Sequence, residues 1–459
     1  MPKTPRHVQE RWAFIAEKLK PVARLDWPVY PCLWAPWTRP SYINCPQTGP
    51  MPRSSLLPIY AQPELGAYGY VEKPWFAPHV RLEALLKALD ERGLGQALER
   101  RSAPAASDVQ LAAFHSKAYV EQVTARCTEG RGSLDTAHPR VVDDVRRLLR
   151  ATAAQQAPTL ISVAAAFEDS LAPAMTFEGY LGYLSKEGLL AVDGDGQTLS
   201  VTPRGRAWLR GETPWFGGPT LARASVETAA RHVAGATIDA MTRILAGEFQ
   251  QAFIPIAGFH HAHREEARMY CLYNDPALAI MTALQHGVGR VAYVDIDIHH
   301  GDGVHHGFAA NPRVCLVDLH EAPRTLFPFT PESPDPAATE PTPWVHQIAE
   351  SDAARVFNVG LAPETDDATY RALWRRAEAF IEASEPDVIV MVSGVDGLGA
   401  DPMSHQALTP DAIAYVTRRV RAVAERHARG RLLVLGGGGY AIDSLCSGWC
   451  AVVEALVDA

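Results

Sequence analysis

Six short apolar runs between residues 253 and 436 restrict the fold of this 459-residue chain more than any other feature. Each run is rich in Val, Ile or Leu, and stretches with helical spacing of apolar residues lie between and around them. Nearly continuous apolar strands with helices between them are typical of a parallel sheet that is buried on both faces. The pattern therefore predicts an α/β fold: a three-layer α/β/α sandwich with a mostly parallel central sheet. The predicted strands are one starting at Leu56 and those at 253–257, 291–298, 314–319, 356–361, 388–393 and 432–436, and the helices are at about 79–92, 221–246, 276–286, 367–383, 410–428 and 441–456.

The segment from about 138 to 211 breaks this alternation. Three helical patterns are followed by two short strands around the turn at 193–196, which is the order of a winged helix-turn-helix. The first 55 residues are rich in Pro and Trp and show one helical pattern at 7–19, so they predict an extension and not a domain. The predicted divisions are an N-terminal extension at 1–55, a main domain at 56–137 and 212–459, and a winged-helix-like insertion at 138–211.

Charge and cysteine usage narrow the expected partners and location. A net charge of −9 supplies no overall positive field, so nucleic acid and anionic membranes are not expected partners. No apolar run approaches the ~18 residues that span a bilayer, and the charged start MPKTPRHVQERW does not resemble a secretory signal. The seven cysteines are scattered and form no CxxC pair, which fits reduced thiols. The expected location is the cytoplasm.

The motif DIDIHHGDG at 295–303 is the strongest chemical signal. In a strand, alternate residues share a face, so Asp295, Asp297 and His299 would point the same way. Cα atoms two residues apart in a strand are ~6.6 Å from each other, which lets Asp297 and His299 hold one ion. Carboxylates and imidazoles suit zinc. A buried polar cluster without metal is the alternative.

Three further predicted strands also end in polar or glycine-rich loops. The strand at 253–257 leads into His260 and His261, that at 388–393 leads into Asp396, and that at 432–436 leads into four glycines and Tyr440. In parallel sheets, ligands bind at the carboxyl ends of the strands. These loops therefore predict one shared site.

Together these motifs resemble the histone deacetylase family, which includes acetoin-utilisation proteins and acetylpolyamine amidohydrolases and has the arginase–deacetylase fold. The resemblance covers about three quarters of the chain. Its strongest stretches are GFHHA, YCLYND, YVDIDIHHGDG, LFP, GVDGLGADPM and LGGGGY, with looser matches at FHSKAYVEQV (114–123) and GETPWF (211–216).

The resemblance implies a role for each of these residues. Asp297, His299 and Asp396 match the family's metal ligands, which implies Zn²⁺ as cofactor. His260 and His261 match its tandem catalytic histidines, and Tyr440 matches the tyrosine that polarises the acyl carbonyl. The carboxylate partners of the histidines correspond to Asp295 and Asp302.

The substrate channel is inferred from the same resemblance. Tyr270 and Phe327 match two aromatic walls, and Met403 matches an apolar rim position that is acidic in polyamine-selective relatives. Met269 departs from the family's usual glycine and could shorten or reshape the channel. Asp318 replaces a serine near the family's bound potassium, which leaves a structural K⁺ open. Cys271 matches a cysteine at the foot of the pocket, where it is a small buried hydrophobe.

Several functions remain open at this point. The first is a lysine deacylase that acts on proteins or peptides, and the second is an acetylpolyamine or other small-amide hydrolase. A DNA-binding or scaffolding protein with a vestigial core, and a dinuclear manganese ureohydrolase, are further alternatives. The insertion at 138–211 has about as many acidic as basic side chains, so it predicts a role in substrate access or self-association rather than DNA binding.

Overall fold

The computed structural model describes only part of the chain. The N-terminal extension at 1–55, the helical pattern at 7–19, the turn at 193–196, most of the helix expected at 176–187 and the motif at 211–216 lie outside the described residues. The described residues are 56–67, 78–130, 134, 139–160, 162–164, 180–181, 184–185, 188–192, 198–210, 222–322, 326–328, 347–351 and 355–458.

Within the described residues, nine strands form one central sheet. All neighbouring strands pair in parallel except β8, which pairs antiparallel with β9 at one edge. The mostly parallel sheet is therefore confirmed. In spatial order the strands are β2 (Leu98–Arg101), β1 (Leu57–Tyr60), β5 (Gln251–Ile254), β11 (Leu432–Leu435), β10 (Val388–Val392), β6 (Val291–Asp295), β7 (Val314–Glu321), β9 (Val356–Leu361) and β8 (Gln347–Ser351).

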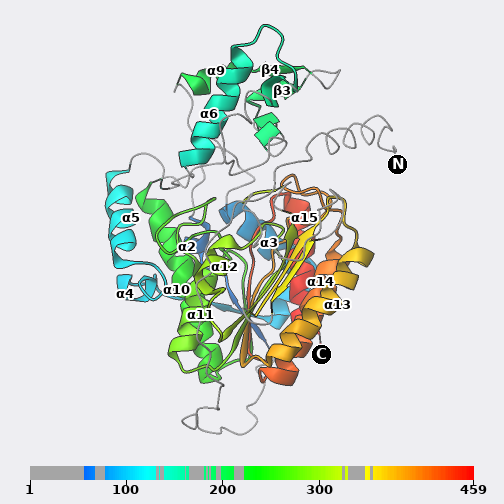
Figure 1. Cartoon of the computed structure of the whole chain (residues 1–459). Helices are drawn as coiled ribbons and strands as arrows, with labels where there is room; N and C mark the ends of the chain where they lie inside the picture. The colour runs from blue at the N-terminus through cyan, green and yellow to red at the C-terminus, as the bar shows by residue number, and fades with distance from the viewer. Residues whose placement is uncertain are drawn as a thin grey trace, which may run out of the picture. The chain divides into compact units, whose positions relative to one another are not determined.

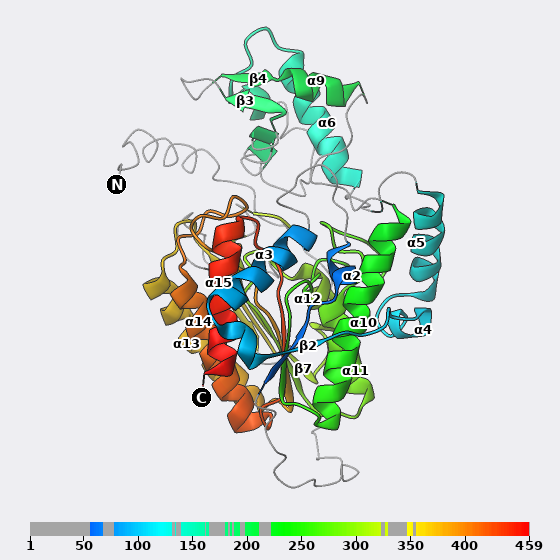
Figure 2. The ribbon, with the colours of Figure 1, turned by 180° about the vertical axis from the view of Figure 1, so that it is seen from behind.

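Helices cover both faces of this sheet, as Figures 1 and 2 show. Two helices, α10 (Ala224–Ala246) and α11 (Asp275–Gln285), pack against each other on one face. On the other face lie α3 (Pro78–Glu91), α13 (Asp367–Ser384), α14 (Pro410–His427) and α15 (Ile442–Val457). This is the three-layer α/β/α arrangement that the sequence predicts. The other helical elements of the main domain are α2 (Pro63–Gly66), η2 (Leu94–Ala97), α4 (Asp108–Leu111), α5 (Lys117–Glu129) and α12 (Asp302–Phe308).

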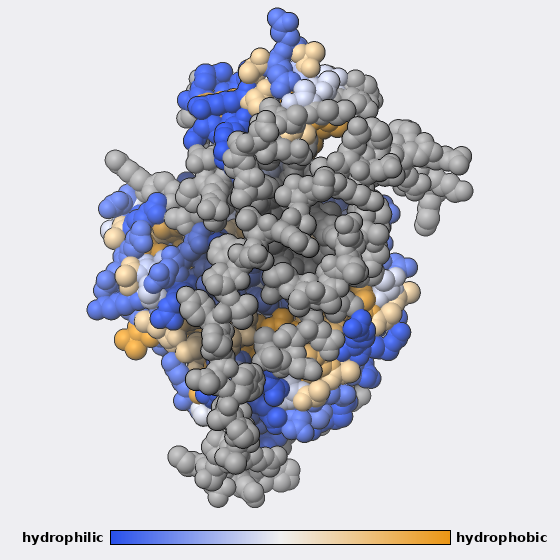
Figure 3. Space-filling model, viewed as in Figure 1, coloured by the Kyte–Doolittle hydropathy of each residue, from blue (hydrophilic) through white to orange (hydrophobic). Residues whose placement is uncertain are grey.

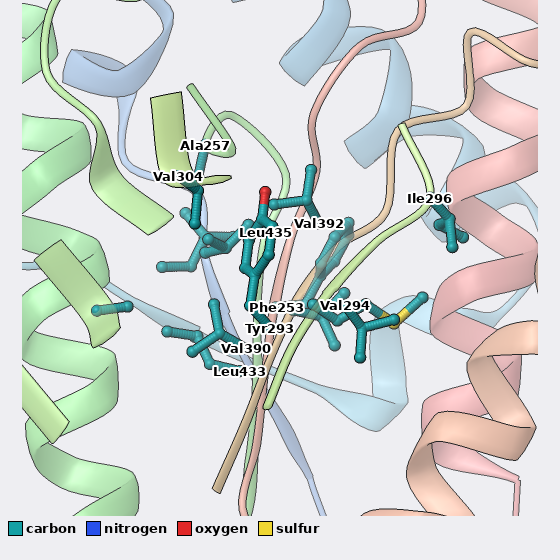
Figure 4. Packing of buried hydrophobic residues seen from close by; sticks show 14 of the residues in the cluster. Phe253, Ala257, Tyr293, Val294, Ile296, Val304, Val390, Val392, Leu433 and Leu435 are labelled. Atoms are coloured by element: carbon teal, nitrogen blue, oxygen red, sulfur yellow. The ribbon is translucent and has the colours of Figure 1, made fainter. Parts of the chain in front are cut away.

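The core lies between the sheet and these helices. The central strands β6, β10 and β11 are buried along their whole length, and Figure 4 shows their side chains packed with those of β5. Phe253, Val390 and Leu433 are completely buried. Each such side chain stabilises the fold by about 1.5–3 kcal/mol. A rigid core thus holds the ends of four strands in fixed positions.

The described residues between 139 and 209, called the small unit below, have an apolar cluster that is separate from the main core. The small unit contains α6 (Pro139–Ala153), the antiparallel pair β3 (Leu190–Val192) and β4 (Leu199–Val201), and α9 (Pro203–Leu209). The first helix and the hairpin are as expected for a winged helix, whereas α9 was not predicted. The signal for α9 was present, since the Thr202 side chain caps the helix and Pro203 follows it. The boundaries at 138 and 211 stay a prediction.

The strand predicted at 291–298 is longer than the strand observed there, β6. Strand β6 ends at Asp295, because Asp295 and Asp297 accept hydrogen bonds from the backbone N–H groups two residues later. Such local side-chain bonds compete with a strand ladder. Two edge strands, β2 and β8, were also missed. Strand β2 reads LERR, a charged sequence typical of edges and not of a buried sheet.

Apolar side chains are mostly inside the molecule. Figure 3 shows mainly hydrophilic side chains, with smaller apolar areas between them, on the described part of the face in view. Among the described residues, no helix has the length and apolar character needed to cross a membrane.

Candidate active site

The predicted polar loops meet at one edge of the sheet. Strands β5, β11, β10 and β6 are parallel neighbours, so the loops that follow them leave the sheet on the same side. A pocket opens there between these loops and α3. Its lining includes Arg81, His260, His261, Met269, Tyr270, Cys271, Asp297, His299 and Tyr440.

Local hydrogen bonds shape the loop after β6. The Asp297 N–H donates to Asp295 Oδ1 at 3.0 Å, and the His299 N–H donates to Asp297 Oδ1 at 2.9 Å. Each aspartate thus makes a turn that mimics a backbone turn. The repeat D-x-D-x-H therefore brings its polar side chains together outside a strand.

Asp297, His299 and Asp396 form a buried group of three potential metal ligands. The His299 Nδ1 lies 3.1 Å from Asp297 Oδ1 and 2.9 Å from Asp396 Oδ2. A single proton on Nδ1 can satisfy only one of these oxygens at a time, whereas a cation between them would satisfy all three donor atoms. Nitrogen and oxygen donors in a three-ligand set suit a catalytic zinc ion. The residues therefore fit the implied metal.

Glycines let the backbone approach these carboxylates closely. The Gly438 N–H donates to Asp297 Oδ2 at 2.6 Å. A Cβ at Gly438 would overlap the Asp396 carboxylate, and one at Gly394 would overlap that of Asp297. Neither position can accept a side chain without moving a potential metal ligand.

Two histidine–carboxylate pairs lie beside this group. His260 Nδ1 is 2.7 Å from Asp295 Oδ2, and His261 Nδ1 is 2.8 Å from Asp302 Oδ1. The two Nε2 atoms face each other at 3.1 Å. Because each carboxylate occupies Nδ1, both imidazoles present Nε2 toward the same space.

The two histidines have opposite pKa shifts. Burial disfavours the charged form of His260, but the Asp295 and Asp297 carboxylates outweigh burial and raise its pKa to about 10. Burial, reinforced by the charge of His260, lowers the pKa of His261 to about 3. Neighbouring groups whose pKa values are pushed apart are typical of acid–base sites. His260 is thus the more basic member of the pair and His261 the less basic one.

The start of α11 holds the tandem histidines in place. Asn274 donates to the backbone carbonyls of His260 and Ala262 at 3.0 and 2.8 Å. Asp275 accepts hydrogen bonds from the N–H groups of Gly258 and Phe259 at 2.9 and 2.8 Å. These buried contacts fix the direction in which the loop presents its imidazoles.

Tyr440 is positioned by Asp401 and by Arg81. The Asp401 carboxylate accepts the Tyr440 N–H at 2.6 Å, and the Arg81 guanidinium lies 5.5 Å from the centre of the tyrosine ring. Arg81 also donates to the Gly437 carbonyl at 2.7 Å. Burial raises the pKa of Tyr440 well above its usual value, so the hydroxyl stays protonated and can donate.

Met269 and Tyr270 form a strained tight turn in the pocket wall. Arg268 and Cys271 exchange backbone hydrogen bonds across them, and their φ angles are 42° and 68°. A turn with two positive φ angles strongly favours Asn and Gly. Met269 therefore occupies a position where glycine would cost less, and the turn brings both side chains to the pocket. Burial raises the pKa of the Cys271 thiol, which keeps it protonated.

The other predicted residues lie around this pocket. The Phe327 ring packs edge-on against His261, with ring centres 5.0 Å apart. The Met403 N–H donates to Asp401 Oδ1 at 2.9 Å. Neither side chain is part of the pocket lining in the described residues, so their place in a substrate channel stays a prediction. Asp318, on β7, pairs in register with Asp295.

Comparison with known proteins identifies the family. The histone deacetylase domain matches residues 76–456, which is most of the chain. The chain belongs to this family. The loops described above therefore lie within a histone deacetylase domain.

Individual relatives agree with the family match. The acetoin utilization protein AcuC of Bacillus subtilis (strain 168) is 33% identical over 236 residues, covering 50% of this chain and 55% of that protein. AcuC of Staphylococcus xylosus is 28% identical over 227 residues, covering 49% and 56%. The match therefore spans little more than half the length of these relatives. The crystal structure of the HDA15 HD domain aligns with a TM-score of 0.57 and 19% identity, over 88% of this chain and 90% of that one, which supports the shared fold.

Sequence reasoning missed several residues of this deacetylase-family site. Arg81, on α3, lines the pocket although it is 359 residues from Tyr440 in the chain. Nothing in its helical pattern distinguishes it from a surface arginine. Asn274, Asp275 and Asp401 lie inside matching motifs, and their polar character next to apolar strands was the available signal.

Proposed function

We propose that the chain is a zinc-dependent amide hydrolase that removes acyl groups from lysine side chains of proteins or peptides. The observation that carries this proposal is the convergence of four groups on one pocket. These are the triad Asp297, His299 and Asp396, two histidine–carboxylate pairs, and the Tyr440 loop.

The triad would hold the zinc ion. When bound there, zinc supplies a Lewis acid for the acyl carbonyl and lowers the pKa of water at the site. Glycines 394 and 438 leave room for the close approach of backbone that this grouping needs.

The two histidines have different roles. His261 is neutral, so its Nε2 can accept a proton from the attacking water and later give it to the leaving amine. The Asp295 carboxylate raises the pKa of His260, which favours positive charge on this imidazole beside the oxyanion that develops. Asp302 and Asp295 fix the two Nδ1 atoms as donors and so fix both ring orientations. A positioned acid–base group of this kind contributes about 10²–10⁴-fold to the rate.

Tyr440 completes the site. Its protonated hydroxyl can donate a hydrogen bond to the acyl oxygen, which strengthens as negative charge accumulates there. Asp401 holds the Tyr440 backbone, and the buried Arg81 guanidinium lies over the ring. Both contacts restrict the directions in which the hydroxyl can point.

Two substrate classes fit this chemistry. A lysine side chain is favoured because the rim position carries Met403, and not the acidic residue that an amine-rich polyamine would require. Acetylpolyamines and other small amides are the second class. A DNA-binding protein with a vestigial core is disfavoured because every predicted catalytic side chain is present.

A substrate panel tests the proposal. The zinc-loaded full chain is assayed on an acetyl-lysine peptide and on acetylspermidine, each beside the matched Asp396→Ala variant. We expect turnover of the peptide that is lost in the variant. Turnover of acetylspermidine alone would move the chain to the second class. Absence of both activities, with zinc bound, would contradict the proposed function.

A further inference from the structure

Arg268 contacts one of the two histidine–carboxylate pairs, and the proposed reaction gives it no role. Its Nη1 donates to Asp302 Oδ2 at 2.8 Å, while Asp302 Oδ1 lies 2.8 Å from His261 Nδ1. Arg268 and His261 therefore hold opposite oxygens of one carboxylate. Asp302 is only 6% exposed, so this charge-assisted hydrogen bond is largely shielded from water.

The contact restricts the direction in which the Asp302 carboxylate can point. A carboxylate that is held at one oxygen can still turn about its Cβ–Cγ bond. Such a turn would carry Oδ1 away from His261, and the imidazole would lose the partner that fixes its orientation. Arg268 prevents this turn because it holds the other oxygen.

A second side chain reaches the same oxygen but is a less permanent donor. His263 Nε2 lies 3.1 Å from Asp302 Oδ2. An imidazole nitrogen donates only in the form that carries a proton there, whereas a guanidinium keeps all of its protons in proteins. Arg268 is therefore the donor that holds Oδ2 in every protonation state of His263.

Arg268 is itself held in place by its backbone and by Glu266. Its N–H donates to the Cys271 carbonyl at 3.0 Å, and its own carbonyl accepts the Cys271 N–H at 2.7 Å. Its Nη2 donates to Glu266 Oε2 at 3.1 Å. Arg268 thus begins the tight turn whose Met269 and Tyr270 line the pocket. One residue joins the pocket wall to the acid–base pair.

The other histidine–carboxylate pair is held differently. The Asp295 carboxylate accepts hydrogen bonds from the Tyr293 hydroxyl and from the Asp297 N–H. Within the described residues, its ion pair is with His260, and none is with Lys or Arg. A side chain that is always positively charged therefore distinguishes the environment of Asp302 from that of Asp295.

This positive charge belongs to a carboxylate that stays ionised. Burial disfavours the charged form of Asp302, but hydrogen bonds from His261 and His263 and the charge of Arg268 outweigh burial and hold its pKa well below the usual value. A charged carboxylate can only accept hydrogen bonds. Loss of the Arg268 donor would therefore leave one buried oxygen of Asp302 less well satisfied and free to move.

We propose that Arg268 is a positioning residue for amide hydrolysis, which holds the Asp302 carboxylate against His261. This inference rests on the proposed function, because that function assigns the proton transfer to His261. In the part of the chain that the structure describes, Arg268 is not among the residues that line the pocket, so its effect reaches the substrate through Asp302. Loss of the guanidinium should therefore slow the chemical step and leave substrate binding unchanged.

Steady-state kinetics of Arg268→Met on the zinc-loaded full chain test this proposal. We expect kcat to fall about 10²-fold, which is the cost of misplacing a reacting group by about 1 Å, with KM and zinc content unchanged. The matched control is Arg264→Met, because Arg264 is an exposed arginine of the same loop, and its kcat should equal that of the wild type. A rise in KM at unchanged kcat would make Arg268 a substrate-binding residue and overturn the proposal.

A double-mutant cycle tests whether Arg268 acts through Asp302. Asp302→Asn alone should lower kcat, and the addition of Arg268→Met should cause no further loss, because the two residues act as one unit. A further loss of about 10²-fold would show independent action and overturn the proposal. If Arg268→Met does not fold, Arg268→Gln takes its place in the cycle, since it also removes the charge.

NMR of isotope-labelled histidine gives a readout that needs no turnover. The His261 Nδ1–H proton should give a slowly exchanging downfield signal, which is assigned by its absence in His261→Ala. We expect this signal to broaden or vanish in Arg268→Met and to persist in Arg264→Met. An unchanged signal in Arg268→Met would overturn the positioning role. A wild type that shows this dependence on Arg268 but cleaves no amide would support the positioning of Asp302 and contradict the proposed function alone.

Discussion

At the scale of single residues, the site separates groups that hold the metal from groups that act on the substrate. Tyr440 belongs to the second kind, because it lines the pocket and keeps a protonated hydroxyl that can donate. His261 likewise contacts Asp302 and His260 and is not a member of the triad. Substitutions at these positions should therefore change turnover without changing metal content.

The first prediction concerns Tyr440→Phe, which deletes one hydroxyl. We expect kcat to fall about 10²–10³-fold, because a lost oxyanion donor raises the barrier by about 2.7–4 kcal/mol. Bound zinc should stay equal to that of the wild type. Peptide turnover and zinc content are measured on the same sample, and unchanged turnover at full zinc content would exclude the role.

The second prediction concerns Met269→Gly in the strained turn. Glycine accepts the φ of 42° without the cost of about 1–2 kcal/mol that a left-handed L-residue bears. Its greater freedom when unfolded offsets about 0.5–1 kcal/mol. The free energy of unfolding should therefore rise by no more than about 1.5 kcal/mol, while the pocket widens. Assays with a series of acyl chain lengths should show a shifted preference, and an unchanged profile would show that Met269 does not shape the pocket.

At the scale of elements, the end of β7 supports the loop that carries Asp396. The buried Glu321 carboxylate accepts the His405 N–H at 2.9 Å, and its other oxygen lies 2.7 Å from His405 Nδ1. Gln406 Nε2 also donates to the Glu321 carboxylate, at 3.1 Å. Burial disfavours the charged form, but these hydrogen bonds outweigh it and lower the pKa of Glu321. Glu321 therefore connects a strand end to the loop of a potential metal ligand.

The third prediction concerns Glu321→Gln. Hydrogen bonds to a charged group contribute about 1.5–3 kcal/mol, so we expect a loss of this size at neutral pH in urea unfolding. Because the pKa of Glu321 is lower in the folded state, its charge stabilises the folded protein at pH values above the unfolded-state pKa of about 4.3. This contribution disappears as the pH falls through the folded-state pKa. The free energy of unfolding of Glu321→Gln should therefore lack this part of its dependence on pH. The exposed Glu425→Gln is the control and should match the wild type. Equal acid profiles for all three proteins would contradict the role.

The elements themselves show what the sequence could and could not predict. Buried strands such as β10 and β11 were predicted to within a residue or two, because burial on both faces requires an unbroken apolar run. Strand β2 could not be predicted in this way, since it lies at an edge of the sheet and reads LERR. The same limit applies to the site. Asp297, His299 and Asp396 follow strands and were predicted, whereas Arg81 reaches the pocket from a distant helix and was not.

At the scale of the whole molecule, the small unit follows α5 and precedes α10 in the chain, and its role is a separate question from that of the pocket. Its own apolar cluster contains Tyr180, which donates to the buried Asp144 at 2.7 Å. The expected helix at 176–187 offers Lys186 as its one basic residue, and phosphate contacts need a positive face. We therefore still favour substrate access or self-association over DNA binding. A cytoplasmic location also stays a prediction.

The fourth prediction concerns removal of residues 138–211, with a short Gly/Ser linker in their place. Because the unit packs around its own cluster, the main domain should still fold and bind zinc. Substrate range or oligomeric state should change, as measured by the substrate panel and by light scattering. Salt-sensitive duplex binding by the wild type, lost on deletion with catalysis unaltered, would assign the unit to DNA instead.

The central claim is that a metal held by Asp297, His299 and Asp396 is required for amide hydrolysis at this pocket. Removing the metal and then restoring it while following acetyl-lysine peptide cleavage is the most direct test. We expect activity to disappear with chelation and to return as zinc is added back, in the wild type and not in Asp396→Ala. Full cleavage by metal-free wild-type protein, or by Asp396→Ala, would contradict the claim.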